Sequence, residues 1–291
     1  MSGHSESLPT KIITARHDSI HQYANPLKMG QNLWAHRELI VQFTKRQVLQ
    51  RYKGSYLGLI WSFITPLALL LVYTFVFSVV FQARWEGTVT DSHGEFALAL
   101  FAGLIAFNIF SETTLAAPHL IINQPNYVKK VVFPLEILPV SMLGAALINS
   151  LFSLAILLAG ALIILGNIPW TLSLLPLMYL PLILLCLGLS WFLASLGVFI
   201  RDIGHFLGVV VQMLFFLTPI FYPISAIPPN FQFFLYLNPL TFIVNHFRRT
   251  ILYGQLPDWG EFLLLTVGTL IGCMLGYIWF MKSKKTFADV V

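Results

Sequence analysis

The stretch LGLIWSFITPLALLLVYTFVFSVVF, residues 57–81, decides the fold class of this chain. It is apolar almost throughout and contains no charged residue. About 20 apolar residues are enough for an α-helix to cross the hydrocarbon core of a bilayer. Backbone N–H and C=O groups find no water there, so they must bond to one another within a helix. The stretch therefore predicts a membrane-spanning α-helix.

The rest of the chain repeats this pattern. The sequence is 57% hydrophobic and only 10% charged over 291 residues, whereas a soluble globular domain carries about 25% charged residues. Five further apolar runs are long enough to span a bilayer, at 96–117, 137–165, 172–200, 203–222 and 262–281. The sequence therefore predicts an all-α integral membrane protein with six transmembrane helices, in one permease-like domain over residues 33–281.

Basic residues are distributed unequally on the two sides of these predicted spans. With the N-terminus inside, nearly all lysines and arginines lie on the inner side, and only Arg84, Arg248 and Arg249 lie outside. The positive-inside rule favours this orientation, and an even number of spans returns the tail, residues 282–291, to the cytoplasm. Residues 1–32 are polar, which predicts a cytoplasmic extension rather than a signal peptide.

Two apolar segments do not fit a straight span. Residues 33–53 place most apolar side chains near one helical face and basic residues largely elsewhere. This pattern predicts an amphipathic helix at the inner membrane interface, with an ordinary cytoplasmic helix as the alternative. Residues 223–259 are apolar but interrupted by prolines, which break helices. They predict short re-entrant helices on the outer side, between the fifth and sixth spans.

The sequence lacks the motifs of ATP hydrolysis and of metal chemistry. No glycine is followed by lysine, so there is no phosphate-binding loop. The histidines are scattered, and Cys186 and Cys273 lie inside apolar runs without zinc or disulfide spacing. We therefore predict a chain that is not an enzyme and has no cofactor of its own. Active transport would need another subunit or an ion gradient.

Several short motifs follow one another in order from Arg51 onward. They are RYKGSYLGLIW at 51–61, VVFPLEILP at 131–139, FIRDI at 199–203, TPIFY at 218–222 and LNPL at 237–240. The ordered set resembles the type-2 ABC exporter permeases for polysaccharides, and is most similar to those for O-antigen. The resemblance implies a homodimer in the bacterial inner membrane, among membrane lipids. It also implies a separate ATPase that holds ATP and magnesium, a lipid-linked glycan as substrate, and no nucleic-acid partner.

The resemblance further implies where the ATPase would bind. Residues 118–132 would form a coupling segment, and residues 33–53 would make a second contact. A solvated loop with positive-inside lysines is the alternative for the first segment. The candidate ATPase-coupling residues are Leu33, Trp34, Arg37, Leu120, Ile121, Tyr127, Lys129 and Lys130.

The phosphate of a lipid-linked glycan would be bound by basic side chains through charge-assisted hydrogen bonds. Arg46, Arg51 and Lys53 are the candidate lipid-phosphate residues, because they lie at predicted headgroup height. Simple attraction to anionic lipid is the alternative. Arg248 and Arg249, on the outer side, would meet the phosphate after crossing or would snorkel to headgroups.

Aromatic rings stack on the C–H faces of sugars, and 14% of the chain is aromatic. A channel for a long glycan needs weak and repeated contacts of this kind. The candidate glycan-channel residues are Trp61, Tyr73, Phe215, Phe216 and Tyr222. The alternative is that these side chains face lipid or the protein core.

Two other functions remain open at this stage. An integral membrane enzyme acting on lipid-linked sugars would need an outer-loop cluster, for which the sequence offers Glu86, Asp91, His93 and Glu95. A solvated loop is the alternative for these residues, since such polar residues are common there. An ion-driven flippase would need buried ionisable residues, and Glu112 is the one acid well inside an apolar run. An inter-helix or interface contact is the alternative for Glu112.

Overall fold

The computed structural model describes residues 25–53, 58–80, 93–129 and 133–290. Within these ranges every regular element is a helix, and no strand occurs. Five segments are long and apolar enough to cross a bilayer, namely Trp61–Val80, His93–His119, Ile137–Leu165, Trp170–Phe199 and Trp259–Val290. The prediction of an all-α, multi-pass membrane protein is therefore confirmed.

These five segments contain the principal helices of the fold. They are α3 (Trp61–Tyr73) with the π-helix η3 (Thr74–Val80), α4 (His93–Ala116) with η4 (Ala117–His119), α6 (Ile137–Leu165), η5 (Trp170–Leu174) with α7 (Leu175–Phe199), and α11 (Trp259–Ser283) with η7 (Lys284–Thr286) and α12 (Phe287–Val290). The bounds predicted for the third span coincide with those of α6.

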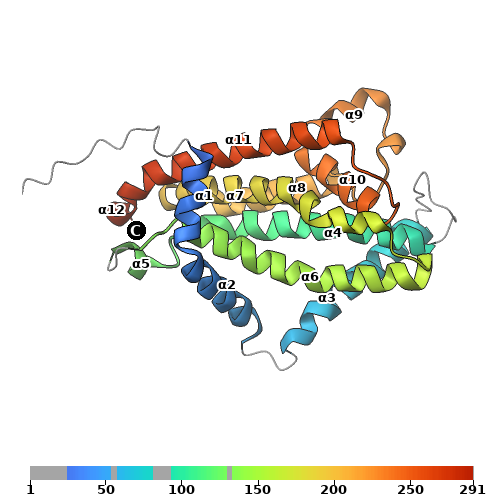
Figure 1. The fold of residues 1–291 in the computed structure, drawn as a ribbon, viewed down its shortest axis with the longest axis horizontal. Coiled ribbons are helices and arrows are strands. Elements are labelled where there is room, and N and C mark those ends of the chain that lie inside the picture. The colour runs from blue at the N-terminus through green and yellow to red at the C-terminus, as the bar shows by residue number, and fades with distance from the viewer. Residues whose placement is uncertain (1–24, 54–57, 81–92, 130–132, 291) are drawn as a thin grey trace, which may run out of the picture.

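Helix α4 lies at the centre of the bundle and packs against α6, α7, α8 and α10. Helix α11 runs along α7 (Figure 1). Their closest approach needs two glycines, because a Cβ on Gly276 would lie 2.1 Å from the backbone oxygen of Gly188. Small residues of this kind let membrane helices approach until backbone packs on backbone.

The two ends of the bundle differ in what covers them. At one end lie α1 (Pro26–Ala35), α5 (Pro125–Lys129) and α12, and at the other lies α9 (Pro229–Tyr236) (Figure 1). The first and last described helices therefore share one end of the molecule.

The single helix predicted for residues 33–53 is wrong, because two helices occupy this region. Helix α1 begins after the cap residue Asn25 and ends at Ala35, and α2 (Arg37–Tyr52) follows after a break at His36. The apolar residues of α2 do not gather on one face: Phe43 is buried, whereas Val41 is 64% exposed. Helix α2 instead packs on α6, where Thr44 Oγ1 donates to the backbone oxygen of Ser141 (3.3 Å). Its position at a membrane interface stays a prediction.

The fifth predicted span, residues 203–222, is also too long. Helix α8 covers only Ile203–Leu217, about 22 Å of helix against a hydrocarbon core of about 30 Å. It ends because Thr218 is extended and Pro219 follows. The proline-rich segment then forms the short helices η6 (Ile224–Ala226), α9 and α10 (Pro239–Ile251). Whether α8 spans a bilayer, and how deep α9 and α10 lie in it, stay predictions.

Candidate functional site

The predicted ATPase-coupling residues lie on elements at the α1 end of the molecule (Figure 1). Helix α1 carries Leu33 and Trp34, α2 begins with Arg37, the turn after η4 carries Leu120 and Ile121, and α5 carries Tyr127 and Lys129. Lys130 lies outside the described residues. The tertiary structure thus gathers these positions from two distant parts of the sequence.

These residues differ in how far a partner could reach them. Trp34 is 71% exposed, and the Arg37 guanidinium lies 5.5 Å from the centroid of its ring, a cation–π contact. Lys129 is also exposed. Ile121 is completely buried, so it anchors its turn in the core. Trp34, Arg37 and Lys129 are therefore the side chains of this set most open to a partner.

An aromatic contact joins the coupling segment to α2. The Tyr127 ring stacks on Phe133 at 4.7 Å, and Phe43 of α2 lies 5.5 Å from Tyr127 and 5.2 Å from Phe133. Arg46 Nη1 donates to the Tyr127 hydroxyl (3.2 Å). Since α2 packs on α6, packed side chains connect α5 through α2 to α6.

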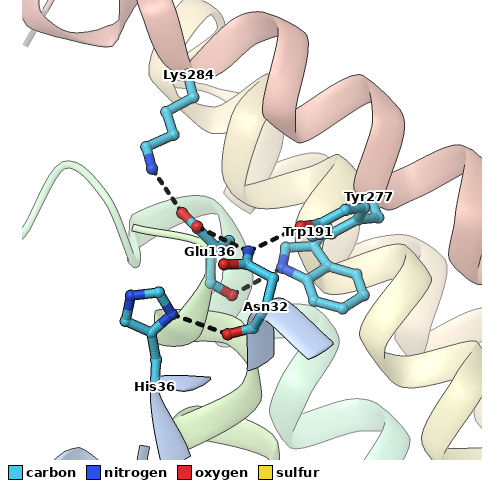
Figure 2. Close-up of polar contacts among 6 residues, drawn as sticks. All are labelled: Asn32, His36, Glu136, Trp191, Tyr277 and Lys284. Atoms are coloured by element: carbon cyan, nitrogen blue, oxygen red, sulfur yellow. Dashed lines mark hydrogen bonds and ion pairs between the residues drawn. The ribbon is translucent and has the colours of Figure 1, made fainter. Parts of the chain in front are cut away.

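A buried carboxylate, Glu136, forms a polar hub at the same end (Figure 2). Its side chain accepts from Lys284 Nζ (2.6 Å) and from Asn32 Nδ2 (3.1 Å), and its backbone oxygen accepts from Trp191 Nε1 (3.0 Å). Asn32 Nδ2 also donates to the Tyr277 hydroxyl (3.0 Å). The hub therefore ties α1, the start of α6, α7, the last turns of α11 and the start of η7 into one unit.

The pKa of Glu136 follows from two opposing effects. Burial raises it, because desolvation disfavours the carboxylate. The hydrogen bond and charge of Lys284, with the hydrogen bond from Asn32, outweigh burial, so the pKa of Glu136 lies below its ordinary value of 4.5. The hub is thus an ion pair at neutral pH. Sequence analysis missed it, although a lone glutamate just before a long apolar run is a visible signal.

The candidate lipid-phosphate residues are spread along α2 rather than gathered at one point. Arg46 bonds to Tyr127, and the guanidinium of Arg51 forms an ion pair with Glu112 of α4, with Nη1 3.3 Å from Oε2. Lys53 is exposed just after α2. The inter-helix contact considered for Glu112 is therefore present, and its partner is one of the proposed phosphate ligands.

Most of the candidate glycan-channel aromatics fall into one cluster. Tyr73 and Phe215 both contact Phe221, at 5.3 Å and 5.0 Å between ring centroids. Phe216 lies at its edge, and the Tyr222 hydroxyl donates to the backbone oxygen of Phe216 (2.7 Å). Phe221 is buried at the centre of the cluster, whereas Phe216 is 55% exposed, so the cluster is only partly packed core in a single chain. Trp61 does not join these contacts and lies in a cavity between α3, α4 and α6.

The observed position of Arg248 differs from the two environments predicted for it from the sequence. Both predicted environments, lipid phosphate and headgroups, are wrong, because its side chain is only 3% exposed. Its guanidinium donates to the backbone oxygens of Ala99 (2.8 Å), Pro219 (2.7 Å) and Ile220 (2.8 Å). Backbone carbonyls outside a helix must find donors within the protein at membrane depth. Arg248 supplies these donors to Pro219 and Ile220, just past the end of α8.

The outer-loop cluster considered for an enzyme is only partly described. Glu86 and Asp91 lie outside the described residues, His93 Nδ1 is 2.5 Å from Ser78 Oγ, and Glu95 is buried. Among the described residues no group of histidine, cysteine, aspartate or glutamate could hold a metal ion.

The fold and these contacts define a multi-pass helical membrane protein, with a packed bundle and a linked set of elements at one end. Its family follows from a comparison with known proteins. The chain belongs to the ABC-2 type transporter family, whose model matches residues 38–252.

Similar proteins match over almost the whole chain. The O-antigen export system permease protein RfbA of Myxococcus xanthus is 26% identical over 268 residues, which is 91% of this chain and 100% of the relative. A protein of the same name from Klebsiella pneumoniae is 27% identical and covers 91% and 99%. The polysialic acid transport protein KpsM of Escherichia coli is 25% identical over 245 residues, which is 79% of this chain and 88% of KpsM.

Proposed function

We propose that this chain is the transmembrane subunit of an ABC exporter that moves lipid-linked polysaccharide, of the O-antigen type, outward across the bacterial inner membrane. The observation that carries the proposal is the similarity to O-antigen permeases over 91% of the chain and essentially their full length. The similarity to a polysialic acid transport protein supports polysaccharide as the wider substrate class.

The energy for export comes from a separate ATPase subunit, which binds ATP and magnesium; this chain supplies no catalytic residue. The ATPase contacts the end of the bundle that carries α1, α2 and α5, through the exposed side chains of Trp34, Arg37 and Lys129. Movement of α5 passes through Tyr127 to Phe43 and then to α6. The Glu136 hub keeps the ends of α6, α7 and α11 together, so that the bundle moves as a rigid body.

Two copies of the chain enclose the export pathway, with both termini in the cytoplasm. Helix α3 supports this proposal, because most of its apolar side chains are exposed within one chain. Arg46 and Lys53 lie near the junction of α2 with the segment before α3. They bind the lipid-linked phosphate on the inner side, with Arg51 balanced by Glu112.

Deletion of the gene tests the proposal. We expect surface polysaccharide to disappear and its lipid-linked precursor to accumulate inside the cell, and the wild-type gene to restore export. Normal surface polysaccharide in the deletion strain would overturn the proposal.

A charge reversal tests the ATPase contact. We expect Lys129→Glu to reduce co-purification of the ATPase subunit and its stimulation by this chain. Asn167→Glu is the control, because it places the same carboxylate on an exposed residue beyond the opposite end of α6. Equal co-purification with the two variants would contradict the proposed contact surface.

A further inference from the structure

A cavity of about 540 Å³ lies between α3, α4 and α6. All three helices are strongly apolar, yet each contributes polar side chains to this one space. The polar side chains of these helices that line it are Ser62 and Thr65 of α3, Asn108, Ser111 and Glu112 of α4, and Asn149, Ser150 and Ser153 of α6. Spacings of three or four positions recur within each set, which places its members near one face of the helix. Polar faces of three helices therefore meet at this cavity.

The two asparagines lie deep along their helices. Asn108 is about 17 Å from the His119 end of the α4 segment, and Asn149 is about 18 Å from the Ile137 end of α6, at 1.5 Å per residue. Both helix ends lie on the side of the molecule that holds α5. With a hydrocarbon core of about 30 Å, these amides lie near the middle of the membrane.

Asn108 needs a polar neighbour from outside the described part of the chain. Its side chain is exposed, although α4 is otherwise the most deeply packed of the long helices. No hydrogen bond joins it to another described residue. An amide left facing hydrocarbon without a partner is unfavourable, and polar residues inside membrane segments usually face a wet cavity or a substrate path.

The charges at the cavity decide what kind of ligand fits. Arg51 and Glu112 line the cavity as an ion pair, so their charges cancel. The other polar groups are amides and hydroxyls, and the rest of the lining is apolar, with the half-exposed Trp61 ring as its one aromatic side chain. Amides and hydroxyls both donate and accept hydrogen bonds, and an aromatic face packs on apolar C–H groups. These groups suit an uncharged, hydroxyl-rich ring better than a phosphate.

We propose that the cavity between α3, α4 and α6 is a sugar-binding subsite of the export pathway, in which Asn108 and Asn149 bond to sugar hydroxyls and Trp61 stacks on a sugar ring. This inference rests on the proposed export function and assigns the glycan to a different face from the Tyr73–Phe215–Phe221 cluster. It predicts that the subsite is wet when empty and shielded when glycan is present.

Cysteine labelling tests both properties. Asn108→Cys is made in a chain with Cys186→Ala and Cys273→Ala, and inside-out membrane vesicles are treated with a charged methanethiosulfonate reagent. The control is Ile148→Cys, which replaces an exposed apolar residue next to Asn149 on α6. We expect the first thiol to react roughly tenfold faster, because only a hydrated thiol ionises readily. Vesicles from cells that make the lipid-linked glycan should react more slowly than vesicles from cells that do not.

Equal reaction rates for the two thiols would overturn the inference, and so would labelling that the glycan does not slow. A disulfide between two copies through Asn108→Cys would also overturn it, because the second chain would then be the polar neighbour.

The export rate gives an independent measurement. Asn108→Leu should lower export about fivefold, the effect of one lost neutral hydrogen bond, while the variant still accumulates and co-purifies with the ATPase. Leu151→Ala, at an exposed apolar site on the same helix as Asn149, should leave export unchanged. Wild-type export by Asn108→Leu refutes the subsite alone. Unchanged surface polysaccharide after gene deletion refutes the export function itself.

Discussion

The first two long helical segments, Trp61–Val80 and His93–His119, differ in a way that hydropathy does not explain. The first has the higher mean hydropathy, 2.3 against 1.7, yet only 6% of its most apolar stretch is buried, against 78% for the second. In water the more apolar helix would be the more buried. In a bilayer the lipid tails are as apolar as leucine, so hydropathy selects membrane helices without ranking them by burial.

Side-chain size explains the difference better. Helix α4 carries Ala99, Ala102, Gly103 and Ala106 along its buried length. At Gly103 an added Cβ would lie 2.8 Å from Arg248 Nη2, so α10 packs directly on the α4 backbone. Helix α3 carries the run Leu69–Val72 instead, and Leu71 is 71% exposed. Small residues let helices approach closely and gain packing energy, whereas large branched ones on α3 are left for lipid or another chain.

The largest expected effect comes from Arg248, whose side chain packs on the buried helix α4. Arg248→Met should destabilise the folded protein by about 3–5 kcal/mol, because the buried carbonyls of Pro219 and Ile220 lose their donor and α4 loses a contact at Ala99. Arg201→Met, in the exposed turn between α7 and α8, should change stability by about 0.5 kcal/mol or less. Thermal unfolding in detergent micelles measures both. Equal stability of the two variants would show that Arg248 does not hold α4 and α10 together.

A pair of leucine truncations tests the comparison directly. Leu100→Ala, at a completely buried site on α4, should cost about 2–5 kcal/mol by leaving a cavity. Leu71→Ala on α3 should cost about 0.5 kcal/mol or less in a separated single chain. A larger loss for Leu71→Ala in the assembled transporter than in the single chain would indicate that α3 is covered by a second copy. Equal losses at the two sites in the single chain would break the comparison.

The Glu136 hub gives the smallest of the three effects, because Lys284 is partly exposed. Glu136→Gln should cost about 1–3 kcal/mol by weakening a charged hydrogen bond. The folded-state pKa of Glu136 is lowered, so its contribution is full above the ordinary value of 4.5 and is lost as pH falls through the folded value. Unfolding midpoints measured from pH 7 to pH 3 should therefore converge for wild type and Glu136→Gln. A constant gap between them at every pH would mean that the ion pair is not the source of the effect.

Local sequence patterns predicted those parts of the fold that depend on neighbouring residues. The bounds of α6 follow from an uninterrupted apolar run that ends at Gly166, whose φ of 74° suits glycine. Helix α10 begins where Asn238 accepts from the backbone N–H of Leu240 and Pro239 follows. The short helices of residues 223–259 were predictable because prolines along this segment begin or end helices. Composition and ordered motifs were sufficient to place the chain in its family.

The break at His36 was less accessible to prediction than the end of α8, which Pro219 marks in the sequence. Periodicity over 33–53 continues through His36, and only the packing of α2 on α6 makes the division into two helices visible. At the candidate site, the members of the Glu136 hub come from positions as far apart as Asn32 and Lys284. No local pattern links them.

The sequence by itself determined that this chain is a helical membrane protein, because length and hydropathy of a run decide whether it can cross lipid. Its motifs, compared with those of known proteins, placed it in the ABC-2 family. Only the tertiary structure decided which helix is central, where Arg248 lies and which polar residues share a cavity. Those outcomes depend on close approach between distant segments and on backbone carbonyls that need a donor from elsewhere in the chain. The order of apolar and polar residues along the chain shows neither the close approaches nor the carbonyls that need a donor. In lipid both depend on packing and hydrogen-bond geometry more than on how apolar a residue is.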